Sequence, residues 1–75
     1  MDKLIWHCFE IVLESSIYIG AFLNKEEADE DFANAMKMWE PVVETYVLGT
    51  VEAETFDKAL DAVRLGDWLS STQLV

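Results

Sequence analysis

Few side chains in this sequence are suited to catalysis or to metal binding. Its one histidine, His7, stands directly before its one cysteine, Cys8. On a strand these two side chains point to opposite faces, so we expect no nucleophilic Cys–His pair. A zinc site takes about four Cys or His ligands, more than this chain holds. We therefore predict a protein that is not an enzyme, with no catalytic residue, no metal site and no cofactor.

Carboxylates are the abundant reactive group, because 15 Asp and Glu stand against 5 Lys and Arg and give a formal net charge of −10. Pairs of carboxylates can hydrolyse glycosides when they flank a substrate cleft. We instead expect these acids on helix faces, in a chain with little room for a pocket. The run Asp29-Glu30-Asp31 also lacks the glycine turn and the later bidentate glutamate of a calcium loop. Neither chemistry is predicted.

The acids are densest between Glu26 and Asp31, where five of six residues are acidic. Two interpretations stay open. One is a solvated helix face near an N-terminus, where the helix dipole favours acids. The other is a row of carboxylates that imitates phosphates and meets a basic groove of a partner. The carboxylates that would bind this partner are Glu26, Glu27, Asp29, Glu30, Asp31, Glu52, Glu54, Asp57 and Asp61.

Composition also limits the class of partner. Affinity for phosphate comes from Lys and Arg, so direct binding of nucleic acid is not expected. A single domain of 75 residues buries only about 60% of its unfolded surface, yet 52% of this chain is hydrophobic and it holds three tryptophans. Apolar surface is therefore expected to serve a partner or a homodimer. Trp6 and Trp68 have no evident core position and are candidate anchors for that partner. Alternatively, they cover the open face of a sheet.

The compartment is predicted from what the sequence lacks. A single cysteine excludes an internal disulfide, and no secretory signal is recognised, so we expect the reducing cytoplasm. The run from Ile17 to Leu23 is far shorter than the ~18 apolar residues of a membrane-spanning helix. No membrane association is predicted.

The first half of the chain is expected to form a hairpin followed by a helix. Residues 4–13 fit a strand or a helix with a polar stripe. We favour the strand, because the segment is rich in β-branched and aromatic residues and a second apolar run, 17–23, follows directly. Asn24 caps a helix from about Lys25 to Trp39, with Glu27 as its capping-box partner. Pro41 marks the end of that helix.

The second half is expected to hold a strand, a helix and a short tail. Val42 to Glu52 has the composition of a strand, in which Gly49 marks a bulge or the turn of a split hairpin. Thr55 caps a second helix that ends at Gly66. The tail from 67 either adds a short strand or frays. The predicted fold is α+β, with a small antiparallel sheet, two helices packed on it, and the order ββαβα with an optional C-terminal strand.

We predict one hydrophobic core between this sheet and both helices. Phe32 and Phe56 belong to this predicted core, because each lies on the apolar face of its helix. The other predicted core residues are Phe9, Ile11, Ile19, Met36, Trp39, Val47, Leu60 and Val63.

One stretch resembles a known class of protein. The run Ala-Glu-Thr-Phe-Asp-Lys-Ala-Leu-Asp at residues 53–61 is similar to a strand–helix segment of small phage-encoded inhibitors, such as those of bacterial RNA polymerase. The chain departs from that pattern at Phe56 and Lys58, and Arg64 is its only arginine, where those inhibitors carry several after the helix. The resemblance implies a phage-type origin and a small α+β fold. It does not carry over the polymerase as target.

Two functional hypotheses follow. In the first, the protein is a non-enzymatic, phage-type inhibitor of a host nucleic-acid-handling enzyme or defence complex, and acts as a DNA mimic. Anti-CRISPR and antirestriction proteins are its analogues. In the second, it is a small self-associating structural or assembly module whose charge serves only solubility. Salt should weaken the first kind of association steeply and the second little.

Overall fold

The computed structural model describes the backbone of residues 2–74 and the side chains of residues 2–72. It forms a four-stranded antiparallel sheet in the order β2-β1-β3-β4, with two helices. The elements are β1 (Leu4–Leu13), β2 (Ile17–Phe22), α1 (Lys25–Trp39), a 3-10 turn (Glu40–Val42), β3 (Val43–Ala53), α2 (Phe56–Leu65) and β4 (Ser70–Leu74). The predicted α+β class is confirmed, and the optional C-terminal strand is present, so the order is ββαβαβ.

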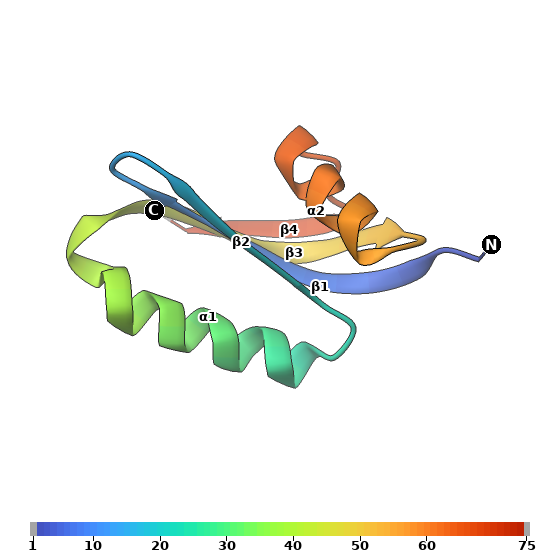
Figure 1. Cartoon of the computed structure of the whole chain (residues 1–75), viewed down its shortest axis with the longest axis horizontal. Helices are drawn as coiled ribbons and strands as arrows, with labels where there is room; N and C mark the ends of the chain where they lie inside the picture. The colour runs from blue at the N-terminus through green and yellow to red at the C-terminus, as the bar shows by residue number, and fades with distance from the viewer. Residues whose placement is uncertain (1, 75) are drawn as a thin grey trace.

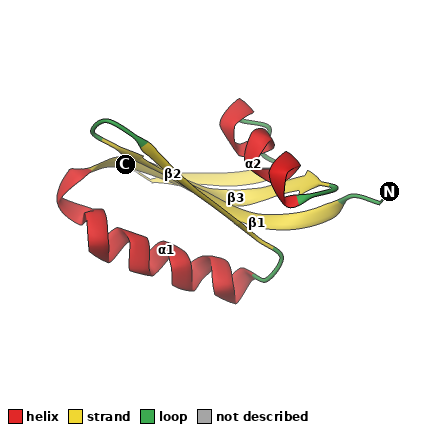
Figure 2. Ribbon diagram, viewed as in Figure 1, coloured by secondary structure: helices red, strands yellow, loops and turns green. Residues whose placement is uncertain are grey.

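The two helices lie on opposite faces of the sheet, with α1 beneath it and α2 above it (Figures 1 and 2). The side chains of β1 alternate between these faces, so Phe9 and Ile11 belong to the α1 face while Trp6 and Cys8 belong to the α2 face. The prediction of a single core shared by both helices is therefore wrong. The sheet separates two cores, because its central strands are apolar on both sides.

The core on the α1 face is built mainly from aromatic rings. Phe9 is fully buried, and its ring lies 5.4 Å from that of Phe32, 5.7 Å from Tyr18 and 6.3 Å from Phe22. Phe32 also contacts Tyr46 at 5.1 Å. Such ring pairs add to the free energy of burial, about 0.5–1.5 kcal/mol each. This cluster fixes α1 along the sheet.

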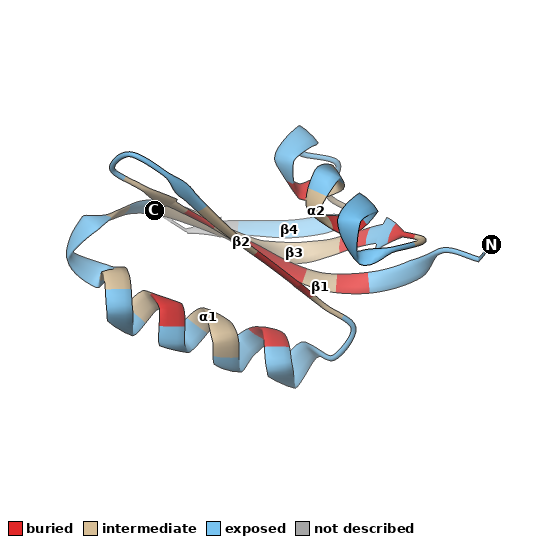
Figure 3. Cartoon of the chain, in the orientation of Figure 1, coloured by how far each residue is buried: buried red, intermediate tan, exposed pale blue. Residues whose placement is uncertain are grey.

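The core on the α2 face is built from smaller side chains around one tryptophan. Val51, Ala59 and Val63 are buried there together with Cys8. Trp6 is 8% exposed, and its indole N–H donates to the carbonyl of Ala53 at 2.9 Å. Small residues let α2 approach the sheet closely, over the end at which β1 begins (Figure 3).

Two of the predicted core positions differ in the structure. Phe56 begins α2 and is 49% exposed, with its ring tilted by 59° to that of Trp6 at 6.2 Å between centroids. Val47 lies outside both clusters of the core. It points to the α2 face at the end of the sheet that α2 does not reach.

β3 is one continuous strand, and Gly49 marks neither a bulge nor a turn within it. Gly49 pairs with Cys8 on one side and Ser71 on the other. A Cβ atom at this position would lie 2.1 Å from the carbonyl oxygen of Ser70 and 2.8 Å from the Trp68 ring. The glycine is therefore needed for the close approach of the tail. The irregular register of β3 occurs elsewhere, opposite Val12 and Leu13.

The helix boundaries agree with the capping signals of the sequence. The Asn24 side chain accepts hydrogen bonds from the backbone N–H groups of Glu26 and Glu27 at 2.8 and 3.3 Å. Thr55 caps α2 by accepting from the N–H of Lys58, and Gly66 ends it in the left-handed region at φ 76°. Over residues 2–74, neither helix has the length and apolarity required to cross a membrane.

Candidate partner-binding surface

Most acidic side chains of α1 are exposed and project away from the sheet, whereas Asp31 is half-buried. Ala28 and Ala35 are buried against the sheet, and Phe32 packs beside them. The helical repeat then directs the acids of the first two turns outward, where Glu26, Glu27 and Glu30 are exposed. We call Glu26, Glu27, Glu30 and Asp31 the α1 acid face.

No cation neutralises the α1 acid face. Across residues 2–72, whose side chains the structure describes, none of its four carboxylates forms an ion pair. The fifth acid of the stretch, Asp29, differs, because the Lys25 ammonium lies 2.8 Å from its carboxylate. Asp29 is thus locally neutralised and does not belong to the unpaired set.

Asp31 is tied to the sheet by a hydrogen bond. The Tyr18 hydroxyl donates to its carboxylate at 3.0 Å. Burial raises the pKa of Tyr18, and the hydrogen bond to Asp31 and the charge of that carboxylate raise it further. Asp31 therefore has a structural role as well as a charge. It lines a shallow hollow of about 180 Å³ together with Phe22, Glu27, Glu30 and Asn34.

The other predicted partner-binding acids do not join the α1 acid face. Glu54, Asp57 and Asp61 lie in or beside α2, on the opposite side of the sheet. Two of them are paired there, since Glu54 lies 3.8 Å from Lys58 and Asp61 lies 3.1 Å from Arg64.

Of the predicted partner-binding acids outside α1, Glu52 is the one that does not lie on the α2 side of the sheet. It pairs with Ile5 at the end of β3, and alternation along the strand directs it toward the α1 face. The expected negative surface that runs continuously from the first helix to the second is thus not formed. The sequence pattern missed this division because it does not tell which face of the sheet each helix covers.

The two candidate tryptophan anchors have places in the fold. Trp6 is a core residue, so its proposed role as an accessible partner anchor is not supported in this structure. Trp68 is half-buried, packs on the α2-face cluster and lies against Gly49. Both side chains pack on the α2 face of the sheet.

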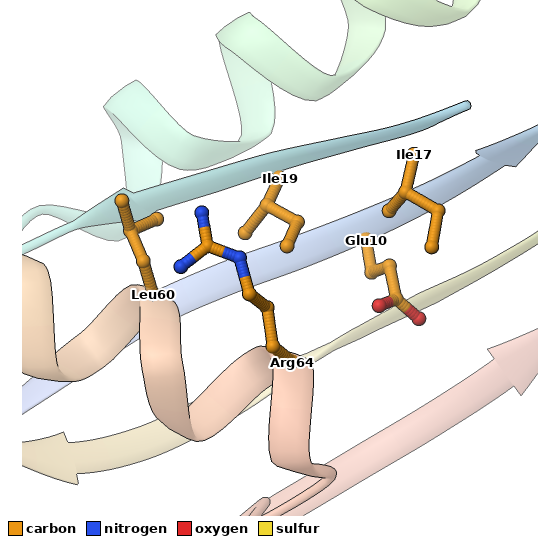
Figure 4. Close-up of a pocket in the computed structure, with 5 residues that line it drawn as sticks. All are labelled: Glu10, Ile17, Ile19, Leu60 and Arg64. Carbon is orange, nitrogen blue, oxygen red and sulfur yellow. The ribbon is translucent and has the colours of Figure 1, made fainter.

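A feature that sequence reasoning missed is the uncovered part of the α2 face next to β2. Ile17 and Ile19 project from β2 to the side of the sheet that carries α2, and together with Leu60 they line a hollow of about 280 Å³ (Figure 4). Glu10 and Arg64 complete its walls. Ile17 is 57% exposed. The alternation of Ile17 and Ile19 was the available signal, but it did not show that α2 stops short of them.

The one cysteine, Cys8, is buried in the α2-face cluster. His7 and Cys8 point to opposite faces of β1, as expected, and burial raises the pKa of the Cys8 thiol to about 11. Within residues 2–74, no group of three His, Cys, Asp or Glu side chains is placed to hold a metal ion. The candidate surface combines charge on one side of the sheet with apolar side chains on the other.

The chain was compared with known protein families, proteins and structures. No protein-family model, no curated protein and no solved structure matches this chain.

Proposed function

We propose that this protein is a non-enzymatic inhibitor that binds a basic, nucleic-acid-handling partner through the α1 acid face. The observation that carries the proposal is the concentration of unpaired carboxylates on one rigid helix. Glu26, Glu27 and Glu30 are exposed and without a cation, whereas the acids of α2 are largely balanced by their own bases.

The unpaired acids of α1 do not stabilise the helix, so their presence needs another explanation. Glu26 and Glu30, like Glu27 and Asp31, are like-charge pairs four residues apart, each of which destabilises a helix by about 0.2–0.5 kcal/mol. The helix dipole offsets part of this cost only for the first turn, which holds Glu26 and Glu27. A partner that supplies Lys and Arg would relieve the remaining repulsion.

The chemistry of that partner follows from the charge. A groove that binds a phosphate backbone carries clustered Lys and Arg, and carboxylates on a helix can meet the same cations. With a net charge of −10, the encounter would be steered by opposite charge and would slow as salt rises. The phage-type origin, the location in the host cytoplasm and the inhibitor class belong to this proposal, and the sequence similarity over residues 53–61 supports the phage-type origin.

Two charge-reversed variants of equal net charge test the proposal. One carries Lys at Glu26, Glu27 and Glu30, and the other carries Lys at Glu54, Asp57 and Asp61. Each reversal adds two units of charge, so both variants carry −4 instead of −10. Asp31 is left intact because it accepts the hydrogen bond from Tyr18.

The parent and both variants are immobilised and exposed to bacterial lysate at low salt, and retained proteins are identified by mass spectrometry. The proposal predicts that nucleic-acid-binding proteins are retained by the parent and by the α2-side variant but lost by the α1-side variant. Equal retention by all three proteins would contradict it. Far-UV circular dichroism checks that each variant is folded.

Self-association is the second candidate function, and exposed apolar side chains favour it. Leu65 is 78% exposed, Leu69 is 59% exposed and Ile17 is 57% exposed. In this alternative the protein is a structural or assembly module and its acids serve solubility. Sedimentation over a range of concentrations at high salt, which screens repulsion between the chains, distinguishes it from a monomeric inhibitor.

A further inference from the structure

The outer edge of β2 is open, and its unpaired backbone groups can be identified. β2 is an edge strand, and across residues 2–74 no strand pairs with its outer side. The backbone N–H of Leu13 donates to the carbonyl of Ser16 at 2.8 Å, which makes these two residues a hydrogen-bonded pair at the hairpin turn. Such pairs alternate along an antiparallel ladder.

The alternation sets which residues of β2 face outward. The next pairs in the register are Val12 with Ile17 and then Ile11 with Tyr18. Tyr18 is therefore bonded to β1, while the N–H and C=O groups of Ile17 and Ile19 point to the open edge, as do those of Ala21. An exposed edge of this kind is a template for an added strand. β2 carries no charge and no proline that would block such an addition.

The two sides of this edge differ in chemistry. On the α1 face, Phe22 adjoins the acidic hollow that Glu27, Glu30 and Asp31 line. On the α2 face, Ile17 and Ile19 line the hollow beneath Leu60 shown in Figure 4. Successive side chains of a strand alternate between faces. A strand added to β2 would thus place every second side chain near carboxylates and the others near aliphatic groups.

We infer that the outer edge of β2 binds an extended segment of a partner protein in which basic and apolar residues alternate. The residues opposite Ile17 and Ile19 are apolar and enter the hollow of the α2 face. The residues opposite Tyr18 and Phe22 are basic and reach the carboxylates beside Phe22. A second copy of this chain is the less suitable occupant, because its own β2 brings a second set of carboxylates to the same edge.

The inference rests on the proposed function in one respect, since both assign a basic partner to the α1 acid face. It adds the backbone edge as the place of recognition and an extended strand as the partner's conformation. The opposite edge, β4, offers no equivalent, because its sequence Ser-Ser-Thr-Gln-Leu provides no apolar row. A lysine substituted into β4 can therefore serve as a control for a lysine substituted into β2, because both variants gain the same charge.

A capped peptide of alternating Lys and Val, long enough to pair with residues 17–22, tests the inference. Its affinity is measured by isothermal titration calorimetry against that of a block peptide, which has the same composition with all Lys before all Val. The alternating peptide should bind about tenfold more tightly, because only its spacing supplies backbone pairing and both side-chain environments together.

Backbone methylation supplies a control without a change in charge. In antiparallel addition, the pattern of this sheet, the Val N–H groups of the peptide face β2 and the Lys N–H groups face away. Methylation of the Val nitrogens should weaken binding about tenfold or more, while methylation of the Lys nitrogens should change it little. Hydrogen exchange of the Ile17, Ile19 and Ala21 amides should slow on binding. Equal effects of the two methylated peptides would overturn the inference.

Two single variants of the protein test whether the peptide binds at the β2 edge. Ile17→Lys puts a charge into the hollow of the α2 face and should weaken the alternating peptide about tenfold, whereas Thr72→Lys, at the exposed opposite edge, should not. Unchanged binding to Ile17→Lys would contradict the inference. If both peptides bind equally but fail with the α1-side triple variant, the edge is not the site while the proposed function stands. If neither peptide binds at low salt, both proposals fail.

Discussion

The two helices of this protein each cover one face of the sheet, but they do so with different side chains. α1 covers its face of the sheet with an aromatic cluster and leaves an outer surface of unpaired acids. α2 is shorter and packs through Ala59 and Val63. Two of the three predicted acids in or beside it, Glu54 and Asp61, pair with Lys58 and Arg64. Net charge alone therefore does not identify the functional side of an acidic protein. The side on which charge is left unpaired is the better guide, and here it is α1.

The same substitution on the two faces should have very different consequences. Phe9→Ala removes a fully buried ring that contacts Tyr18, Phe22 and Phe32, and should cost about 3–5 kcal/mol. Phe56→Ala removes a ring that is 49% exposed and lies 6.2 Å from the ring of Trp6, so about 1.5 kcal/mol or less is expected.

Urea denaturation followed by circular dichroism measures both changes. A loss of 3–5 kcal/mol is a large share of the total stability of so small a domain, so Phe9→Ala should be mostly unfolded without a stabilising cosolvent. If the two variants melt alike, the faces are not packed as described.

Alkaline pH should destabilise the α2 face through Cys8. Burial holds the pKa of the folded thiol at about 11, above the ordinary value of 9.0 that applies to the unfolded chain. Above pH 9 the unfolded state loses this proton first, so the stability associated with the neutral thiol falls as pH rises from 9 to 11. The loss reaches about 2–3 kcal/mol.

The comparison of the parent with Cys8→Ala isolates this effect, because the variant lacks the thiol. Its stability at neutral pH will be lower, but its decline between pH 9 and pH 11 should be shallower than that of the parent. Parallel curves would mean that the thiol titrates freely in the folded protein. The pKa of Tyr18 is also raised, so Tyr18→Phe provides the equivalent test on the α1 face.

An added methyl group should separate β4 from the rest of the sheet. Gly49→Ala brings a Cβ into the backbone of Ser70 and against Trp68, and such overpacking costs about 1–3 kcal/mol. The effect should be local to the tail. We expect faster hydrogen exchange in β4 with little change in β1. A uniform loss of protection across the sheet would show that β4 is an integral part of one cooperative unit.

The smallest predicted effects have opposite signs on the two helices. Glu30→Gln removes a like-charge neighbour of Glu26 and should stabilise the protein by about 0.2–0.5 kcal/mol. Asp61→Asn removes the pair with Arg64 and should destabilise it by a similar amount. Thermal melting at low salt measures both, and added salt should reduce each difference. The same sign for both changes would contradict the contrast between the helices.

Local signals in the sequence predicted most of the elements. Asn24, Thr55 and Gly66 predicted the helix ends because capping depends on one or two nearby backbone groups. The strand prediction for residues 4–13 is confirmed, and its helical alternative is wrong. The β-branched and aromatic residues of that run are suited to the central strand of the sheet, buried on both faces.

What the sequence could not predict depends on contacts far apart in the chain. The face covered by each helix decides that Trp6 is buried and that Phe56 is half-exposed. Neither burial could be predicted from the hydrophobic periodicity. That periodicity identifies the apolar side of a helix or strand, but not the element that packs against it. The close approach of Trp68 to Gly49 is likewise a long-range contact. The same limit explains why the candidate acids on α2 were grouped with those on α1.

The central claim is that the α1 acid face competes with nucleic acid for a basic groove. Its most direct test uses a partner captured from lysate, loaded with fluorescent double-stranded DNA, and follows the anisotropy of the DNA during titration. The parent protein and the α2-side triple variant should displace the DNA, and the α1-side triple variant should not. Displacement by the α1-side variant at the parent's concentration, or binding of the parent without any release of DNA, would contradict the claim.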